Sequence, residues 1–303
     1  MWLSWLDGVR EAVATLVRES LPEPQASLLL GIMMGVKSGL PSGFYEALRV
    51  TGTIHVVVVS GYNISVLINT LARGLIWVPL KLRLVLTVIF IFLFVMLVGP
   101  EAPVVRAAIM GTIALLGTVL GRQNDAMRLF LVSVVLMLII KPEWAGELSF
   151  QLSFLATLGL IVVFPLLDRL IPGKGAFLRE DLLTTLSAQV LVWPLIAFTF
   201  GQISLLSPLV NALLLWTVPF ITYLGLVTVT VGVFIRQIGW LLMIPVRVLL
   251  DYFIWITELF SSLKMGYFEV SVFSVLALAF YFVVLGGSLW FLSQISAEKR
   301  EIE

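Results

Sequence analysis

The residues with the clearest chemical potential lie between His55 and Asn63. His55 is the only histidine of 303 residues, and it is followed by four valines and then by the polar step Ser60-Gly61-Tyr62-Asn63. A serine nucleophile needs a base nearby to take its proton, and His55 is the one imidazole in the chain. On a continuous helix five residues turn through about 500°, which leaves the two side chains about 140° apart around the axis. The spacing therefore argues against a serine hydrolase.

The other common hydrolytic chemistries also lack their residues. One histidine and no cysteine leave only carboxylates as further zinc ligands, and there is no His-x-x-x-His pattern. Gly173-Lys174-Gly175 lacks both the earlier glycine and the following Ser or Thr of a phosphate-binding loop. Without cysteine there is also no disulfide. We therefore expect no enzymatic activity, no cofactor and no metal in this chain.

The elements that must position these residues are transmembrane helices. Hydrophobic residues make up 60% of the chain and charged residues 12%, and the mean hydropathy is +1.09; ordinary soluble domains are about a quarter charged. Apolar stretches recur at lengths close to the ~20 residues that cross a bilayer. We predict an all-α fold, a polytopic transmembrane helical bundle with broken and interfacial helices. The expected spans are 44–72 (broken), 79–99, 103–120, 126–141, 147–167, 182–200, 206–234 (bent near Pro219) and 271–293.

The sequence divides into three regions. Residues 1–24 are charged and amphipathic, without the layout of a signal peptide, and are expected to form an interfacial segment. Residues 25–293 form one integral membrane domain, and 294–303 a short polar tail. Within the domain, 25–40 is too short and glycine-rich to assign as a span. The stretch 237–262 carries three charges along one helical face and is expected to lie flat in the interface: Arg247, Asp251 and Glu258.

Charge placement predicts an orientation in the cytoplasmic membrane. Basic connections alternate with acidic or uncharged ones, and short basic connections stay on the cytoplasmic side. If 237–262 lies flat, residues 294–303 end outside; if it spans, they end inside. The sequence leaves both alternatives open. The residues assigned to the cytoplasmic side are Arg73, Lys81, Arg83, Arg122, Arg128, Arg169, Lys174, Arg179 and Arg236.

Several polar residues occur at membrane depth and have two interpretations each. Arg106 either snorkels to the interface or aims its guanidinium into a polar path, where it would meet phosphates. His55 is equally compatible with a buried hydrogen bond between helices. Ser153 and Gln151 lie on different helix faces. Each either faces the polar path or forms a hydrogen bond to a neighbouring helix, as polar residues in transmembrane helices commonly do. Polar residues near a proline mark either a packed kink or a bend that lines a pore. Gln189 precedes Pro194 and Asn211 precedes Pro219, and Gln202 lies between these two pairs.

Three separated blocks of sequence together resemble the integral membrane domain of the ComEC-type competence family. Their order and spacing fit that family over roughly residues 25 to 290. Asn63 departs from the family pattern, which usually has histidine there, and this argues against obligatory acid–base chemistry. The blocks are Gly52-Thr53-Ile54-His55 through Ser60-Gly61-Tyr62-Asn63; Val104 through Met110; and Phe150 through Ala156, followed by Ala188-Gln189 to Pro194 and by Phe200 through Ser204 with Asn211.

The resemblance implies a channel that passes single-stranded DNA across the cytoplasmic membrane during natural transformation. Full-length relatives add an oligonucleotide-binding-like domain and a metallo-β-lactamase-like nuclease domain. We therefore expect a separate nuclease and a cytoplasmic motor or strand-binding proteins as partners, besides single-stranded DNA and the lipid bilayer. The candidate residues of the DNA path or gate are His55, Ser60, Gly61, Tyr62, Asn63, Arg106, Gln151, Ser153, Gln189, Gln202 and Asn211.

Two other functions fit the same residues. A secondary transporter for a small solute or ion also uses broken helices at the bilayer midplane. A purely structural membrane subunit would pair all its polar groups between helices. The channel is preferred because a phosphate cannot enter hydrocarbon and needs a wet or hydrogen-bonding path, with contacts weak enough to release the strand. Tyr62 is positioned in sequence to stack transiently on bases.

Overall fold

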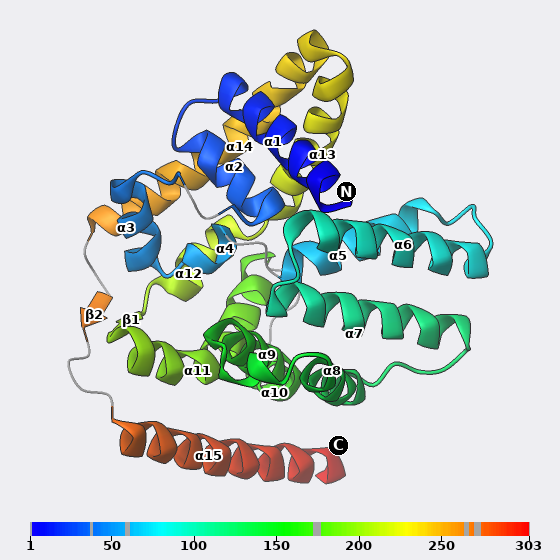
Figure 1. Cartoon of the computed structure of the whole chain (residues 1–303). Helices are drawn as coiled ribbons and strands as arrows, with labels where there is room; N and C mark the ends of the chain where they lie inside the picture. Colours follow the sequence, from blue (N-terminus) through cyan, green and yellow to red (C-terminus); the bar gives the residue numbers. More distant parts are fainter. Residues whose placement is uncertain are drawn as a thin grey trace.

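The computed structural model describes residues 2–36, 39–57, 61–171, 177–263, 267–269 and 274–302, and these are almost entirely helical (Figure 1). The first half contains α1 (Trp2–Ser20), α2 (Gln25–Met34), α3 (Ser42–Thr51), α4 (Ile54–Val57), α5 (Gly61–Gly74), α6 (Leu80–Val98), α7 (Ala102–Val119) and α8 (Ala126–Ile140). The second half contains a 3-10 helix (Pro142–Gly146), α9 (Leu148–Val162), α10 (Phe164–Leu170), α11 (Phe177–Phe200), β1 (Gln202–Ser204), α12 (Ser207–Leu214), α13 (Thr217–Phe234), α14 (Arg236–Ser262), β2 (Tyr267–Glu269) and α15 (Val275–Ile302).

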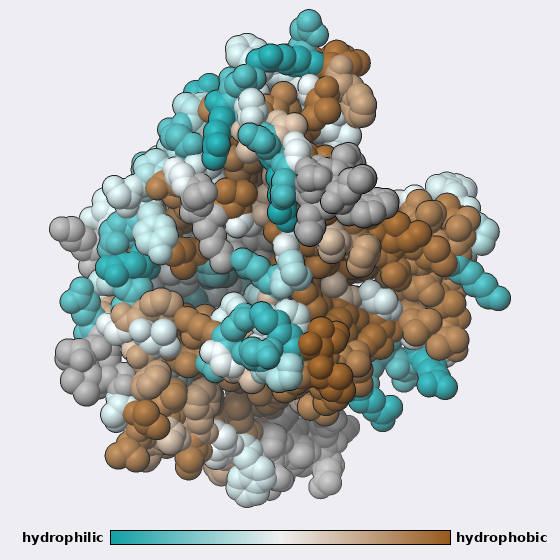
Figure 2. Space-filling model, viewed as in Figure 1, coloured by the Kyte–Doolittle hydropathy of each residue, from teal (hydrophilic) through white to brown (hydrophobic). Residues whose placement is uncertain are grey.

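The prediction of a multi-pass helical membrane protein is confirmed. Seven helical stretches of the described chain are long and apolar enough to cross a bilayer. Large apolar side chains cover the outside of α6, where Phe92 is 62% exposed, and Figure 2 shows this hydrophobic surface. An apolar surface of this extent on a soluble protein would aggregate, but in a bilayer it faces the acyl chains.

The predicted break between 44 and 72 is present at Gly52, which separates α3 from α4. α3 ends at Thr51 because Gly52 adopts a left-handed conformation (φ 71°), which glycine reaches without steric cost. The polar step at Ser60 lies outside the described residues, and the chain is described again from Gly61, in α5.

Prolines explain the remaining breaks. α9 gives way to α10 just before Pro165, and α12 gives way to α13 just before Pro219. α11 continues through Pro194, which has no N–H to offer the carbonyl of Val190 four residues earlier. The Tyr281 hydroxyl of α15 donates to that Val190 oxygen at 2.9 Å. This hydrogen bond ties the otherwise exposed α15 to the kink of α11.

The short segment that the sequence left unassigned forms a central buried helix. Every residue from Ala26 to Met34 of α2 is buried, and α1, α3, α13 and α14 belong to the same hydrophobic core. A ten-residue helix is too short to span a bilayer, so its apolar character is satisfied by protein instead. Among its neighbours, Val17, Leu48, Ile221 and Phe253 are fully buried.

The N-terminal helix α1 is fastened to the end of α6. Val13 and Val17 face the core, while Arg10 reaches the last turn of α6. Its Nε donates to the Leu97 oxygen at 2.7 Å and its Nη2 to the Met96 oxygen at 3.1 Å. The last carbonyls of a helix have no partner within the helix, so a cation is favourable there.

The pairing of β1 with β2 determines how the chain returns after α11. Ile203 lies opposite Phe268 in this antiparallel pair, so the end of α11 and the start of α15 lie on the same side of the molecule. α12, α13 and α14 must therefore bring the chain back to the side that it left. A spanning 206–234 followed by a flat 237–262 would leave β2 on the opposite side, so the strand pairing favours the alternative in which 237–262 spans.

α14 has the length and hydropathy of a span, but it carries charges at its middle. Arg247 Nε lies 3.7 Å from Asp251 Oδ2, and Gln25 of α2 donates to Asp251 at 2.6 Å. A charge at the centre of a membrane helix costs about 2.5–3.5 kcal/mol unless it is paired or hydrated. These contacts reduce that cost and tie α14 to α2.

In Figure 1 the end of α15 lies on the same side as the α5–α6 and α7–α8 connections and opposite the strands. The arginines predicted to be cytoplasmic include Arg73 and Arg83, which flank the first connection, and Arg122, which lies in the second. If that prediction holds, the end of α15 is also cytoplasmic. We predict that green fluorescent protein fused after Ile302 fluoresces, whereas alkaline phosphatase is active only when inserted after Leu205, beside β1. Active phosphatase at both positions would contradict the topology that the strand pairing implies.

Candidate functional site

Arg106, in the second turn of α7, is the centre of the candidate site. Its Nε donates to the Ser153 hydroxyl of α9 at 2.8 Å, and Nη1 lies 3.6 Å from the Met110 sulfur. The guanidinium carbon lies 6.0 Å from the ring centroid of Phe154, at the outer limit of a cation–π contact. Arg106 and Ser153 come from the second and third sequence blocks, so the structure brings these two blocks together.

The first block reaches the same point through Gly61. A Cβ at this first residue of α5 would lie 2.7 Å from Arg106 Nη2 and 3.2 Å from the Pro103 oxygen. A Cβ here would push the guanidinium away from Gly61 and press on the Pro103 carbonyl, so glycine allows this part of α5 to lie directly against the guanidinium. The glycine in Ser60-Gly61-Tyr62-Asn63 is therefore explained by the arginine of the second block.

The electrostatics of this site favour an anion. Among the described residues no carboxylate oxygen lies within the 4.0 Å of an ion pair with Arg106. Gly61 of α5 lies against the same guanidinium and adds no negative charge to it. A positive side chain inside a membrane domain is costly unless it is paired or hydrated, so this site attracts a negative group. A guanidinium has five N–H donors, and the contacts above use only part of them.

The single histidine lies on the short α4, next to the Gly52 turn. His55 is exposed, whereas Val56 and Val57 beside it are buried. Its Nδ1 lies 3.0 Å from the Gly52 oxygen. A carbonyl can only accept, so Nδ1 carries the proton and Nε2 of the neutral ring is left as an acceptor.

A second polar cluster surrounds Ser207, the first residue of α12. The Gln189 amide of α11 and the Asn211 amide of α12 both donate to the Ser207 hydroxyl, the latter at 3.2 Å. A Cβ on Gly52 would lie 2.8 Å from that hydroxyl and 3.3 Å from the Ser204 Cβ. The cluster thus lies directly against the turn whose carbonyl holds His55.

A third network lies at the strands, outside the membrane-spanning helices. The Tyr267 hydroxyl donates to Gln202 Oε1 at 2.8 Å and accepts from Arg49 Nη2 at 3.2 Å. Arg49 also pairs with Glu46 at 2.9 Å, and this hydrogen bond raises the pKa of the guanidinium above its ordinary value. Gln202 therefore serves a network that holds β2 to α3, and it does not join the Ser207 cluster by a hydrogen bond.

The remaining predicted residues are placed as follows. The Gln151 amide donates to the Ala145 oxygen at 2.9 Å, so it binds the 3-10 helix and not the Arg106 site. Ser60 lies outside the described residues. Tyr62 and Asn63 lie in the first turn of α5, and their side chains are not among those described.

Three residues of these polar networks were not predicted from the sequence. Ser207 is the hub of the second cluster, and Arg49 and Tyr267 build the network at the strands. The Gln202–Ser207 stretch without charge was the one available signal for Ser207. Nothing local indicated Tyr267, because its contacts join residues 218 and 65 positions away.

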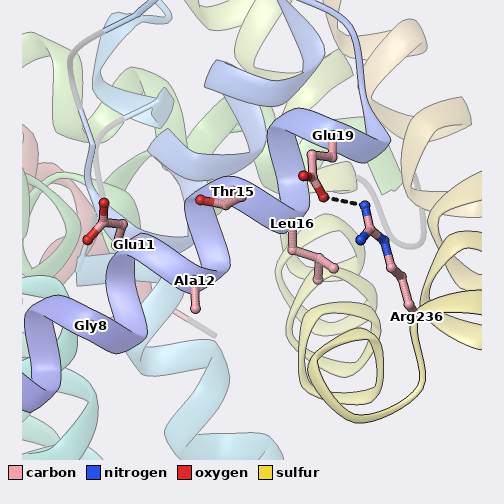
Figure 3. Close-up of a pocket in the computed structure, with 7 residues that line it drawn as sticks. All are labelled: Gly8, Glu11, Ala12, Thr15, Leu16, Glu19 and Arg236. Carbon is pink, nitrogen blue, oxygen red and sulfur yellow. Dashed lines mark hydrogen bonds and ion pairs between the residues drawn. The ribbon is translucent and has the colours of Figure 1, made fainter.

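No other part of the described structure presents a comparable site. The described residues contain no group of three or more His, Asp or Glu side chains that would hold a metal. A shallow groove of about 450 Å³ lies between α1 and the start of α14 (Figure 3). Its charged residues include the Glu19–Arg236 pair at 2.6 Å, and it contains none of the predicted site residues.

Comparison with known proteins connects this arrangement to competence proteins. The sequence model of the family described as Competence protein matches residues 32–294. ComE operon protein 3 of Bacillus subtilis (strain 168) is 24% identical over 238 residues, which cover 77% of this chain and 29% of that protein. The chain therefore spans less than a third of that relative's length. No solved structure matches.

The contact of Gly61 with Arg106 makes a direct prediction. Gly61→Ala forces α5 away from the guanidinium and is expected to destabilise the protein by about 1–3 kcal/mol, the usual cost of overpacking. Gly74→Ala, at the other end of α5 where a Cβ meets nothing within 4 Å, is the matched control. Thermal unfolding in detergent measures both variants. Equal melting temperatures for the two variants would contradict the close approach.

Proposed function

Because the chain belongs to the Competence protein family, we propose that it forms the part of a DNA-uptake system through which single-stranded DNA crosses the cytoplasmic membrane. The observation that supports this most strongly is the convergence of three distant sequence blocks on Arg106. Gly61 and Ser153 both contact it, and no described carboxylate neutralises it. An unpaired arginine inside a membrane domain is costly and therefore indicates a functional contact.

The chemistry of the site suits a phosphodiester. A phosphate group carries one charge and several acceptor oxygens, and the guanidinium binds such oxygens through paired N–H donors. A single such site holds the strand weakly, which transport requires, because many strong contacts would trap it.

The strand must be moved by other proteins. We expect no catalysis by this chain: neither the Arg106 site nor the Ser207 cluster contains a carboxylate, and His55 is bonded to its own helix turn. A cytoplasmic motor or strand-binding proteins would supply the driving force, and a separate nuclease would supply the single strand. The exposed side chain of His55 fits the wall of the DNA path, where its Nε2 would accept hydrogen bonds.

A transporter of a small anion is the second candidate. The broken helix from α3 to α5 and the positive site at Arg106 would both serve it. The two functions differ in the size of what passes. Proteoliposomes separate them, because a transporter passes inorganic phosphate and excludes oligonucleotides, whereas the proposed channel passes labelled single strands.

The proposal predicts the behaviour of Arg106 variants. Arg106→Gln removes a charge-assisted hydrogen bond worth about 1.5–3 kcal/mol and is expected to lower transformation frequency about 10- to 100-fold. Arg106→Lys keeps the charge but loses the planar fork, so an intermediate effect is expected. Arg122→Gln, in the exposed connection after α7, is the control and should transform normally.

Protein levels in the membrane are compared by immunoblot, so that a loss of uptake is not confused with a loss of protein. Normal transformation by Arg106→Gln, with normal amounts of protein, would refute the role of the site.

A further inference from the structure

The Ser207 cluster has hydrogen-bonding capacity that its own members do not use. The side-chain oxygens of Gln189, Asn211 and Ser204 are buried and have no hydrogen-bond partner among the described residues. Asn211 is 1% exposed and Ser207 2%. Leaving a buried acceptor unsatisfied costs about 1–3 kcal/mol, so three in one place indicate that something else supplies donors there.

The three oxygens lie close together. Each amide oxygen shares its carbon with the nitrogen that reaches the Ser207 hydroxyl, so both lie in the immediate surroundings of Ser207. Ser204 flanks the same Gly52 position. Each amide donates one of its two N–H groups to Ser207, whereas its oxygen has no partner, so the unsatisfied groups here are mainly acceptors.

The unsatisfied acceptors indicate the chemistry of the group that would bind to the cluster. A phosphate is disfavoured, because its oxygens are acceptors and would leave both amide oxygens unsatisfied. A cation is disfavoured, because α12 begins at Ser207 and brings the positive end of a helix to the cluster. A neutral group that carries N–H donors satisfies both conditions. The exocyclic amino and ring imino groups of nucleobases are such donors, and Asn and Gln are the side chains that commonly pair with base edges.

The cluster and the Arg106 site are held by two helices that pack together, with a short offset along the helix axis. α9 and α11 pack as a hairpin in which Gly159 touches the Ser187 backbone. Ser153 is therefore level with a position four residues beyond Gln189, a separation of about 6 Å along the helix axis. One or two nucleotides cover this distance, at roughly 3.4 Å each along a stacked strand.

We propose that the Ser207 cluster binds the N–H groups of nucleobases while Arg106 binds the phosphates of the same strand. This inference rests on the proposed function and adds a second subsite to it. Gly52 covers the cluster, so a base enters only when the turn at Gly52 and α4 moves aside. Because all four bases carry at least one N–H donor, the contact is tolerant of sequence.

The test compares oligothymidylate with N3-methylated oligothymidylate, which has the same charge and ring but no N–H donor. Binding is measured by fluorescence anisotropy with the protein in lipid nanodiscs. Wild type is expected to bind the unmodified strand about 3- to 10-fold more tightly. Gln189→Leu and Asn211→Leu should bring this ratio close to one. Gln25→Leu removes another amide whose oxygen lacks a partner, on α2 outside the cluster, and should keep the wild-type ratio.

The outcomes separate the two levels of the proposal. A wild-type ratio of one, or variants that weaken both strands equally, would overturn the base contact and indicate buried water at the cluster. If wild type binds neither strand, the proposed function fails, and the second subsite fails with it.

Discussion

The close approach of Gly61 to the Arg106 guanidinium is the constraint on which the site depends. It depends on a glycine in α5, because a Cβ at this position would displace the guanidinium. Among the described residues no carboxylate pairs with this guanidinium, so the site is complementary to an anion. Ser153 then orients the guanidinium from α9 by accepting from Nε. The packing of the helices thus brings together residues from three distant sequence blocks, and Arg106 and Ser153, for example, are 47 positions apart.

The broken segment from α3 to α5 connects this positive site to the neutral Ser207 cluster. At one end Gly61 contacts Arg106, and at the other Gly52 contacts Ser207 and holds His55 through its carbonyl. Glycine is required at both ends for close approach, and at Gly52 also for its left-handed conformation. A segment that touches two polar clusters of opposite hydrogen-bonding character is well placed to follow a strand whose phosphates accept hydrogen bonds and whose bases donate them.

Much of the fold could be predicted from sequence, because apolar length and proline positions report directly on membrane helices. The spans matched α6, α7 and α11 closely, and the break at Gly52 lies within the segment that was expected to be broken. Whether 237–262 spans was left open by the sequence, because the answer depends on the pairing of residues 202–204 with 267–269. Arg106, Ser153 and Gly61 were identified as candidates, but their contact was not. The buried α2 and the hub role of Ser207 depend on tertiary packing that no local pattern reveals.

The most direct measurement uses the absence of cysteine from the sequence. In an Arg106→Cys variant the introduced thiol is the only one in the chain, so methanethiosulfonate reagents of either charge modify that position alone. If Arg106 meets phosphates in a hydrated path, the ethylammonium reagent restores passage of single-stranded DNA into proteoliposomes and the ethylsulfonate reagent does not. A thiol that reacts with neither reagent, or a passage that both reagents affect equally, would contradict this role for Arg106.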